Sequence, residues 1–226
     1  MSTSKIALIA GATGLVGSYC LDFLLHDNYY DEVIVVTRRS TGKVHRKMKE
    51  VLVDFDHLEN FATELTADHI FCCLGTTIKT AGSKEKFVQV DKHYPIHLAK
   101  VCRQQGASEF LVISAMGADR ASWIFYNKVK GAMQDELLSI GYPSVHIVQP
   151  SLIMGERSEQ RNGEKLAKVF FENMGFLFKG PLRKYAGIDA KTIAGAMVYY
   201  AKEGTKGSHI HTSEELQQVW DDFYAK

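Results

Sequence analysis

The chain has 226 residues, of which 46% are hydrophobic, and its formal net charge is +1. This length can supply one sizeable core and is short for two independent domains. A nearly neutral chain has no electrostatic footprint for nucleic acid or for an anionic membrane surface, so we expect neither partner. Its apolar runs are too short to cross a bilayer, which argues against membrane insertion and against a signal peptide.

Short apolar runs typical of buried strands alternate with segments of helical periodicity through the first two thirds of the chain. The predicted strands are residues 5–10, 32–37, 50–53, 69–74, 109–114 and 144–149. The predicted helices are residues 17–25, 88–104 and 122–139, and Pro95 should kink the second or mark its true start. Strands that alternate with helices predict an α/β fold with a doubly wound, Rossmann-type parallel sheet.

The pattern loosens after Pro150. We expect a polar loop at 156–163, a helix at 164–174, a helix from Asp189 through Ala201 and a short strand at 209–211. Thr212 and Glu215 fit a capping box for a last helix. One domain should therefore span 1–226, with the cofactor on 1–150 and the substrate side on 151–226. The expected contributors to the substrate wall are Leu152, Ile153, Met154, Arg157, Phe170, Phe171 and Met174.

The cysteines fall in segments predicted to be buried, and none has the spacing of a metal ligand; they are Cys20, Cys72, Cys73 and Cys102. Free thiols in a core are typical of a reducing compartment, so we expect a cytoplasmic protein. His209 and His211 would share one face of a strand, without an evident carboxylate or cysteine partner. We therefore predict no metal site.

Residues 11–17, GATGLVG, connect the first predicted strand to the first helix. In this context Gly11 permits a tight turn, Gly14 lets the backbone approach a pyrophosphate, and Gly17 lets helix and strand pack closely. The helix N-terminus would offer amides and a positive dipole to the phosphates. We predict dinucleotide contacts at Gly11, Gly14 and Gly17. The alternative is a glycine turn that only packs a helix on a strand.

The end of the second predicted strand indicates which dinucleotide is bound. An NAD site usually has an acidic residue there for the ribose 2′-hydroxyl, whereas this chain has Arg38 and Arg39. A guanidinium pairs well with the 2′-phosphate of NADP, so we predict NADP(H). The alternative is that both arginines are solvated. Asp54, after the third strand, is expected either to contact the adenine or to cap its loop.

Ser114, Tyr126 and Lys130 are the candidate catalytic residues. Tyr126 and Lys130 are four apart on a predicted helix and so share one face, and Ser114 ends the preceding strand. A tyrosine can donate a proton to a carbonyl oxygen if a nearby ammonium lowers its pKa, and a serine can polarise the same oxygen. Lys130 could also hold the nicotinamide ribose. The alternative is an exposed pair beside a capping serine.

Several motifs together resemble an atypical short-chain dehydrogenase/reductase, and within that family the Tat-interacting-protein branch and its small bacterial relatives. They are GATGLVG, the turn of Leu74, Gly75 and Thr76, Ser114 in VISAMGAD, YNKVK at 126–130, and Gln149-Pro150. The resemblance implies a single Rossmann-type domain, bound NADPH and a Ser114–Tyr126–Lys130 triad. It also implies cofactor contacts at Thr13, Leu15, Val16, Arg38 and Gly75, together with Leu74 and Thr76 of the same turn. The ordinary short-chain enzymes add an asparagine from the fourth helix, and the nearest candidate in this chain is Asp91.

The leading hypothesis is an NADP-dependent oxidoreductase that acts on a small carbonyl or alcohol. The main alternative is an NADPH-binding regulatory or interaction protein without significant turnover, which fits a homodimer or another protein partner. A nucleotide-sugar epimerase is a weaker alternative, because its substrate needs a larger region after the sixth strand than this chain offers.

Overall fold

The computed structural model describes residues 5–155 and 187–225. Its principal strands are β1 (Ile6–Ala10), β2 (Glu32–Thr37), β3 (Met48–Leu52), β4 (His69–Cys72), β5 (Glu109–Ile113), β6 (Ser144–Gln149) and β9 (Gly207–Thr212). They form one parallel sheet in the order β3-β2-β1-β4-β5-β6-β9. A separate short parallel pair joins β7 (Ile153–Met154) to β8 (Ile188–Asp189).

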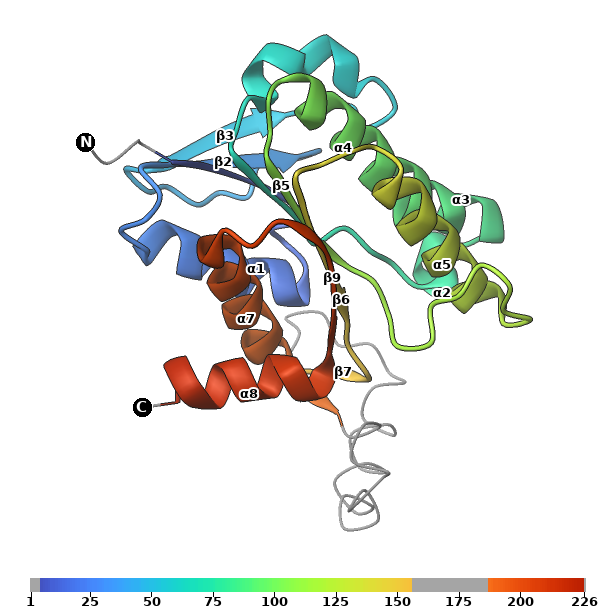
Figure 1. The fold of residues 1–226 in the computed structure, drawn as a ribbon. Coiled ribbons are helices and arrows are strands. Elements are labelled where there is room, and N and C mark those ends of the chain that lie inside the picture. The colour runs from blue at the N-terminus through green and yellow to red at the C-terminus, as the bar shows by residue number, and fades with distance from the viewer. Residues whose placement is uncertain (1–4, 156–186, 226) are drawn as a thin grey trace.

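Helices cover both faces of the sheet (Figure 1). One face carries α1 (Leu15–His26), α7 (Ala190–Glu203) and α8 (Ser213–Phe223). The other carries the 3-10 helix η1 (Leu58–Leu65), α4 (Tyr94–Gln104) and α5 (Phe125–Leu138). Before α4 the chain forms α2 (Ile78–Ala81), α3 (Lys84–Val88) and the π-helical turn η2 (Gln89–His93).

Side chains of β1 alternate between two cores. Ala7 and Ile9 pack under α1, α7 and α8, whereas Leu8 and Ala10 pack on the opposite face. Burial on both faces explains the continuous apolar runs of the central strands. The predicted doubly wound, Rossmann-type α/β fold is confirmed.

The observed elements differ from the prediction in a few places. The third strand begins at Met48 and ends at Leu52, slightly earlier than expected. The long helix expected at 88–104 is divided by η2, and Pro95 is the second residue of α4, so the proline marks a helix start. No helix was predicted at η1 or α2. The loop expected at 156–163 and the helix expected at 164–174 lie outside the described residues.

The described part of the C-terminal region joins the same sheet. Strand β9 pairs with β6, and α7 packs against α1. The Asp189 side chain caps α7 by accepting from the Lys191 amide at 2.7 Å, and the predicted capping box of Thr212 and Glu215 begins α8. A sheet shared by both regions supports the expectation of a single domain.

The strand order places a topological switch between β1 and β4, because consecutive connections leave β1 in opposite directions. Ligands of open α/β sheets bind at the carboxyl ends of the strands at such a switch. The glycine turn, the turn after β4 and Ser114 all lie at the carboxyl ends of these central strands. Within the described ranges, none of the helices is long and apolar enough to cross a membrane.

Candidate functional site

The glycine turn connects the carboxyl end of β1 to α1. Gly11 has a φ of +87°, and a Cβ there would lie 2.5 Å from the Cys73 carbonyl oxygen. A Cβ on Gly17 would lie 2.1 Å from the Gly11 carbonyl oxygen, so Gly17 lets α1 pack directly on the turn. Gly14 is the N-cap of α1 and, within the described residues, no side chain caps the helix there. The first amides of α1 therefore remain available to an anionic ligand, which fits a dinucleotide pyrophosphate.

The end of β2 is polar and open. Arg38 and Arg39 are both exposed, and Thr37 donates its hydroxyl to the Arg39 carbonyl at 2.8 Å. Asp54 is also exposed, and its carboxylate accepts the Asp56 amide at 3.0 Å. Asp54 therefore caps its own loop, which is one of its two predicted roles. Its contact with an adenine remains a prediction.

The turn after β4 is tied to η2. The Thr76 amide donates to Asp91 Oδ2 at 2.8 Å, and a Cβ on Gly75 would lie 3.5 Å from Asp91 Oδ1. Leu74 packs against the core beneath α4. Asp91 is only 1% exposed. The π-helical turn thus inserts a carboxylate between the predicted cofactor loop and α5, and such turns are frequent at functional sites.

One face of α5 packs against the end of β5. Lys130, which is 3% exposed, lies 2.8 Å from Asp91 Oδ1 and donates to the Ile113 carbonyl at 3.3 Å. Tyr126 lies one turn earlier, in the first turn of α5, with its ring centroid 5.5 Å from that of Phe87. Sequence spacing predicted the shared face of Tyr126 and Lys130. It did not predict that Asp91 would pair with the ammonium.

Ser114 follows β5 and is held by two elements. Its amide donates to the Val148 carbonyl at 2.7 Å, and its Oγ accepts a hydrogen bond from Gln134 Nε2. Gln134 Oε1 in turn accepts from Gln149 Nε2 at 3.1 Å. Sequence reasoning missed Gln134, although its position one helical turn after Lys130 was the available signal. Tyr126, Lys130 and Gln134 thus form a continuous row on α5.

Burial and neighbouring charges shift the pKa values of Tyr126 and Lys130. Burial raises the pKa of the Tyr126 phenol, the Lys130 ammonium opposes this rise, and Asp91 adds to it. Burial lowers the pKa of Lys130, but Asp91 and Tyr126 outweigh it and the net pKa is raised. The lysine therefore acts on Tyr126 in the expected direction. The net pKa of Tyr126 is nevertheless raised, because burial dominates and Asp91 offsets the lysine charge.

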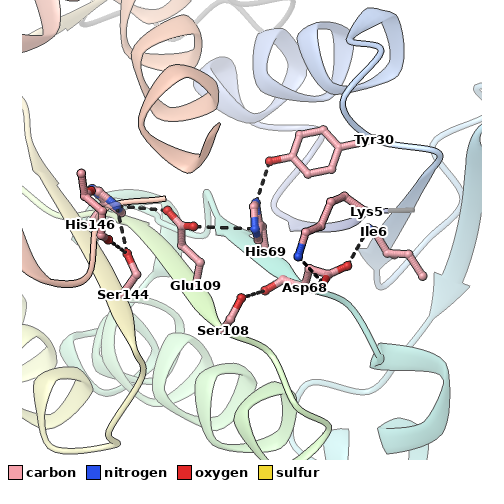
Figure 2. Close-up of polar contacts among 10 residues, drawn as sticks. Lys5, Ile6, Tyr30, Asp68, His69, Ser108, Glu109, Ser144 and His146 are labelled. Atoms are coloured by element: carbon pink, nitrogen blue, oxygen red, sulfur yellow. Dashed lines mark hydrogen bonds and ion pairs between the residues drawn. The ribbon is translucent and has the colours of Figure 1, made fainter. Parts of the chain in front are cut away.

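A second polar cluster lies at the other ends of the strands, near the amino ends of β4 and β5 (Figure 2). Glu109 Oε1 is 3.0 Å from His146 Nε2, and Glu109 Oε2 is 3.7 Å from His69 Nε2. His146 Nδ1 is 2.9 Å from His211 Nε2, and His69 Nδ1 is 2.9 Å from the Tyr30 hydroxyl. His211 is therefore linked to a carboxylate through His146, a link that the sequence did not reveal. Among the described residues no cluster suits a metal ion, and all four cysteines are free.

The expected substrate wall is described only in part. Leu152 and Met154 are each 42% exposed, and Ile153 pairs with Ile188. A Cβ on Gly155 would lie 3.1 Å from Leu15 Cδ1, so the segment after β7 approaches the start of α1. The other predicted wall residues lie outside the described residues: Arg157, Phe170, Phe171 and Met174.

Comparison with known proteins agrees with this architecture. The model of the NAD dependent epimerase/dehydratase family matches residues 7–121. Protein HTATIP2 of Rattus norvegicus is 30% identical over 175 residues, which cover 76% of this chain and 72% of the relative. Protein fmp52, mitochondrial, of Aspergillus niger is 29% identical over 224 residues, covering 96% and 94%. The solved oxidoreductase ylbE from Lactococcus lactis superposes with a TM-score of 0.68 at 17% identity, covering 96% and 97%.

A Rossmann sheet with this glycine turn, together with these relatives, indicates a nicotinamide-dinucleotide-binding protein of the atypical short-chain dehydrogenase/reductase type. The chain belongs to the NAD dependent epimerase/dehydratase family. The name of the fungal relative places that protein in mitochondria. A cytoplasmic location for this chain remains a prediction.

Proposed function

We propose that the chain binds NADP(H) and catalyses the oxidation or reduction of a small alcohol or carbonyl compound. The observation that carries this proposal is the contact that the α5 row makes with the end of β5: Lys130 donates to the Ile113 carbonyl and Gln134 donates to Ser114, at the carboxyl ends of the strands, where the glycine turn also lies. The bound nicotinamide would supply or accept the hydride. Arg38 and Arg39 support NADP over NAD, because an exposed guanidinium suits the ribose 2′-phosphate.

Four residues of the site have a role in this proposal. Tyr126 donates a proton to the substrate oxygen during reduction and removes it during oxidation. The buried charge of Lys130 lies close enough to oppose the rise in the Tyr126 pKa, and so eases formation of the phenolate. Ser114 donates a hydrogen bond to the same substrate oxygen as negative charge develops on it. Asp91 holds the Lys130 ammonium and the Thr76 amide in one place.

The substrate is expected to be small. The described part of the region after β6 forms α7, β9 and α8, which pack on the sheet and its first helix. These elements complete the sheet and leave no separate lobe among the described residues for a nucleotide-sugar substrate.

A carbonyl panel followed by NADPH absorbance tests this proposal, with Tyr126→Phe as the variant. We expect turnover by the wild type and a decrease in kcat of about 100-fold or more in the variant, because general acid catalysis is lost. NADPH affinity should persist in both proteins. Equal rates would remove Tyr126 from the reaction. Tight NADPH binding without turnover on any substrate would instead favour the regulatory alternative.

A further inference from the structure

Gln134, the last residue of the α5 row, and Gln149 form a series of hydrogen bonds that ends on Ser114. Gln134 is 6% exposed on α5, and Gln149 is half-buried at the end of β6. Gln149 Nε2 donates to Gln134 Oε1 at 3.1 Å, and Gln134 Nε2 donates to Ser114 Oγ. The two amides therefore run head to tail toward the serine. Neither glutamine was among the predicted site residues.

The order of donors and acceptors in this series of hydrogen bonds determines where the Ser114 hydroxyl can direct its own proton. A hydroxyl has one proton to donate and lone pairs to accept. Because Ser114 Oγ accepts from Gln134, its own proton remains free for another acceptor. Within residues 5–155 and 187–225 no acceptor receives that proton, since the hydrogen bond of Ser114 Oγ is the one that Gln134 donates.

We propose that Gln134 and Gln149 are positioning residues that make Ser114 a hydrogen-bond donor to the reacting substrate oxygen. This inference rests on the proposed oxidoreductase function. A developing alkoxide is stabilised by preorganised donors and is repelled by lone pairs. Gln149 presents an N–H to Gln134, which makes Gln134 present its own N–H to Ser114. A carboxylate at position 149 would reverse both steps.

The sharpest variant is Gln149→Glu, because its new charge is separated from Ser114 by the whole Gln134 side chain. A carboxylate at 149 accepts only, so the Gln134 amide should turn and present its oxygen to Ser114. The Ser114 hydroxyl would then donate its hydrogen bond to Gln134, and the substrate oxygen would lose that donor. We expect kcat to fall by about 100-fold, as when a single oxyanion donor is removed, while KM changes little.

The same substitution in a Ser114→Ala background separates positioning from a general structural effect. If the glutamines act through the serine, Gln149→Glu should cost little further activity once the hydroxyl is gone. An equal loss in both backgrounds would overturn the inference. Gln104→Glu, on an exposed position at the end of α4, is the matched control for an added charge and should leave kcat unchanged.

A readout that does not need turnover keeps this inference separate from the proposed function. The side-chain amide resonance of Gln134, followed by ¹⁵N NMR, should shift in Ser114→Ala and in Gln149→Glu but not in Gln104→Glu. An unmoved resonance in the first two variants overturns the hydrogen-bonded chain, whatever the enzyme activity. A shifted resonance with an unchanged kcat overturns the positioning role, and absent wild-type turnover overturns the proposed function.

Discussion

A buried ammonium such as that of Lys130 needs a compensating charge, because removing a cation from water costs several kcal/mol. Asp91 supplies it at 2.8 Å, and the Ile113 carbonyl accepts a second hydrogen bond. An ammonium has three donors, and two of them are used within the part of the chain that the structure describes. The pair therefore holds the lysine charged beneath Tyr126, although the carboxylate partly cancels its field.

Replacing Asp91 by asparagine tests this arrangement. The asparagine could still accept the Thr76 amide, but Lys130 would be left without its counter-charge. We expect the free energy of unfolding to fall by about 3 kcal/mol, measured by urea denaturation at pH 7. Glu136→Gln is the matched control, because Glu136 is accessible to solvent where it pairs with Lys100 at 3.1 Å and with Lys92 at 3.3 Å, and its loss should cost less than about 1 kcal/mol. Similar losses in the two variants would contradict the account.

At the residue scale, the sequence predicted which residue types form the site and which helix face carries them. It did not predict which side chains pair with one another. The four-residue spacing was enough to place Tyr126 and Lys130 on one face of a helix. The Asp91–Lys130 pair depends on the π-helical turn η2, which rotates Asp91 toward α5 and has no local sequence signal comparable to a capping box. The contact between Gln134 and Ser114 likewise depends on how α5 sits against β5.

At the scale of elements, the position of α1 depends on Gly17, which has no side chain. A Cβ at position 17 would lie 2.1 Å from the Gly11 carbonyl oxygen, so alanine must push α1 away from the glycine turn. We expect Gly17→Ala to lower the free energy of unfolding by about 1–3 kcal/mol, as overpacking does, and to weaken NADPH binding. Fluorescence titration and chemical denaturation measure the two effects. Ser18→Ala, the next position on α1, should leave both nearly unchanged, and an equal weakening there would refute this role of Gly17.

The histidine cluster at the amino ends of the strands makes stability depend on pH. Burial, aided by His146, lowers the pKa of His211 to about 4, and burial also lowers the pKa of His69 despite Glu109. These histidines bind protons more readily when unfolded, so stability should fall as the pH falls from about 6.5 toward 4.

The slope of this dependence identifies the residue responsible. Each histidine contributes at most about 1.4 kcal/mol per pH unit. We expect His211→Gln to flatten the decrease in unfolding free energy between pH 6.5 and 4, followed by denaturation at several pH values. His26→Gln, on the exposed end of α1, is the matched control for the loss of a histidine outside the cluster. An unchanged slope in His211→Gln would exclude its titration as the cause.

At the scale of the whole molecule, patterns with strong periodicity predicted the fold well. Runs such as that of β1 are apolar throughout because both faces of the strand are covered, and this burial is readable in one sequence. The helix η1 and the division of residues 88–104 were missed because they depend on packing rather than on periodicity. The histidine cluster was also missed, since Glu109, His146 and His211 become neighbours only when β5, β6 and β9 align.

The central claim is that the glycine turn and the arginines after β2 hold NADP(H), and a direct fluorescence titration of NADPH against NADH tests it. We expect NADPH to bind about 10- to 100-fold more tightly, the effect of charge-assisted hydrogen bonds to the 2′-phosphate. Arg38→Ala combined with Arg39→Ala should remove most of that preference and leave NADH affinity nearly unchanged. NADH binding as tight as NADPH binding in the wild type, or a preference that survives loss of both arginines, would contradict the account.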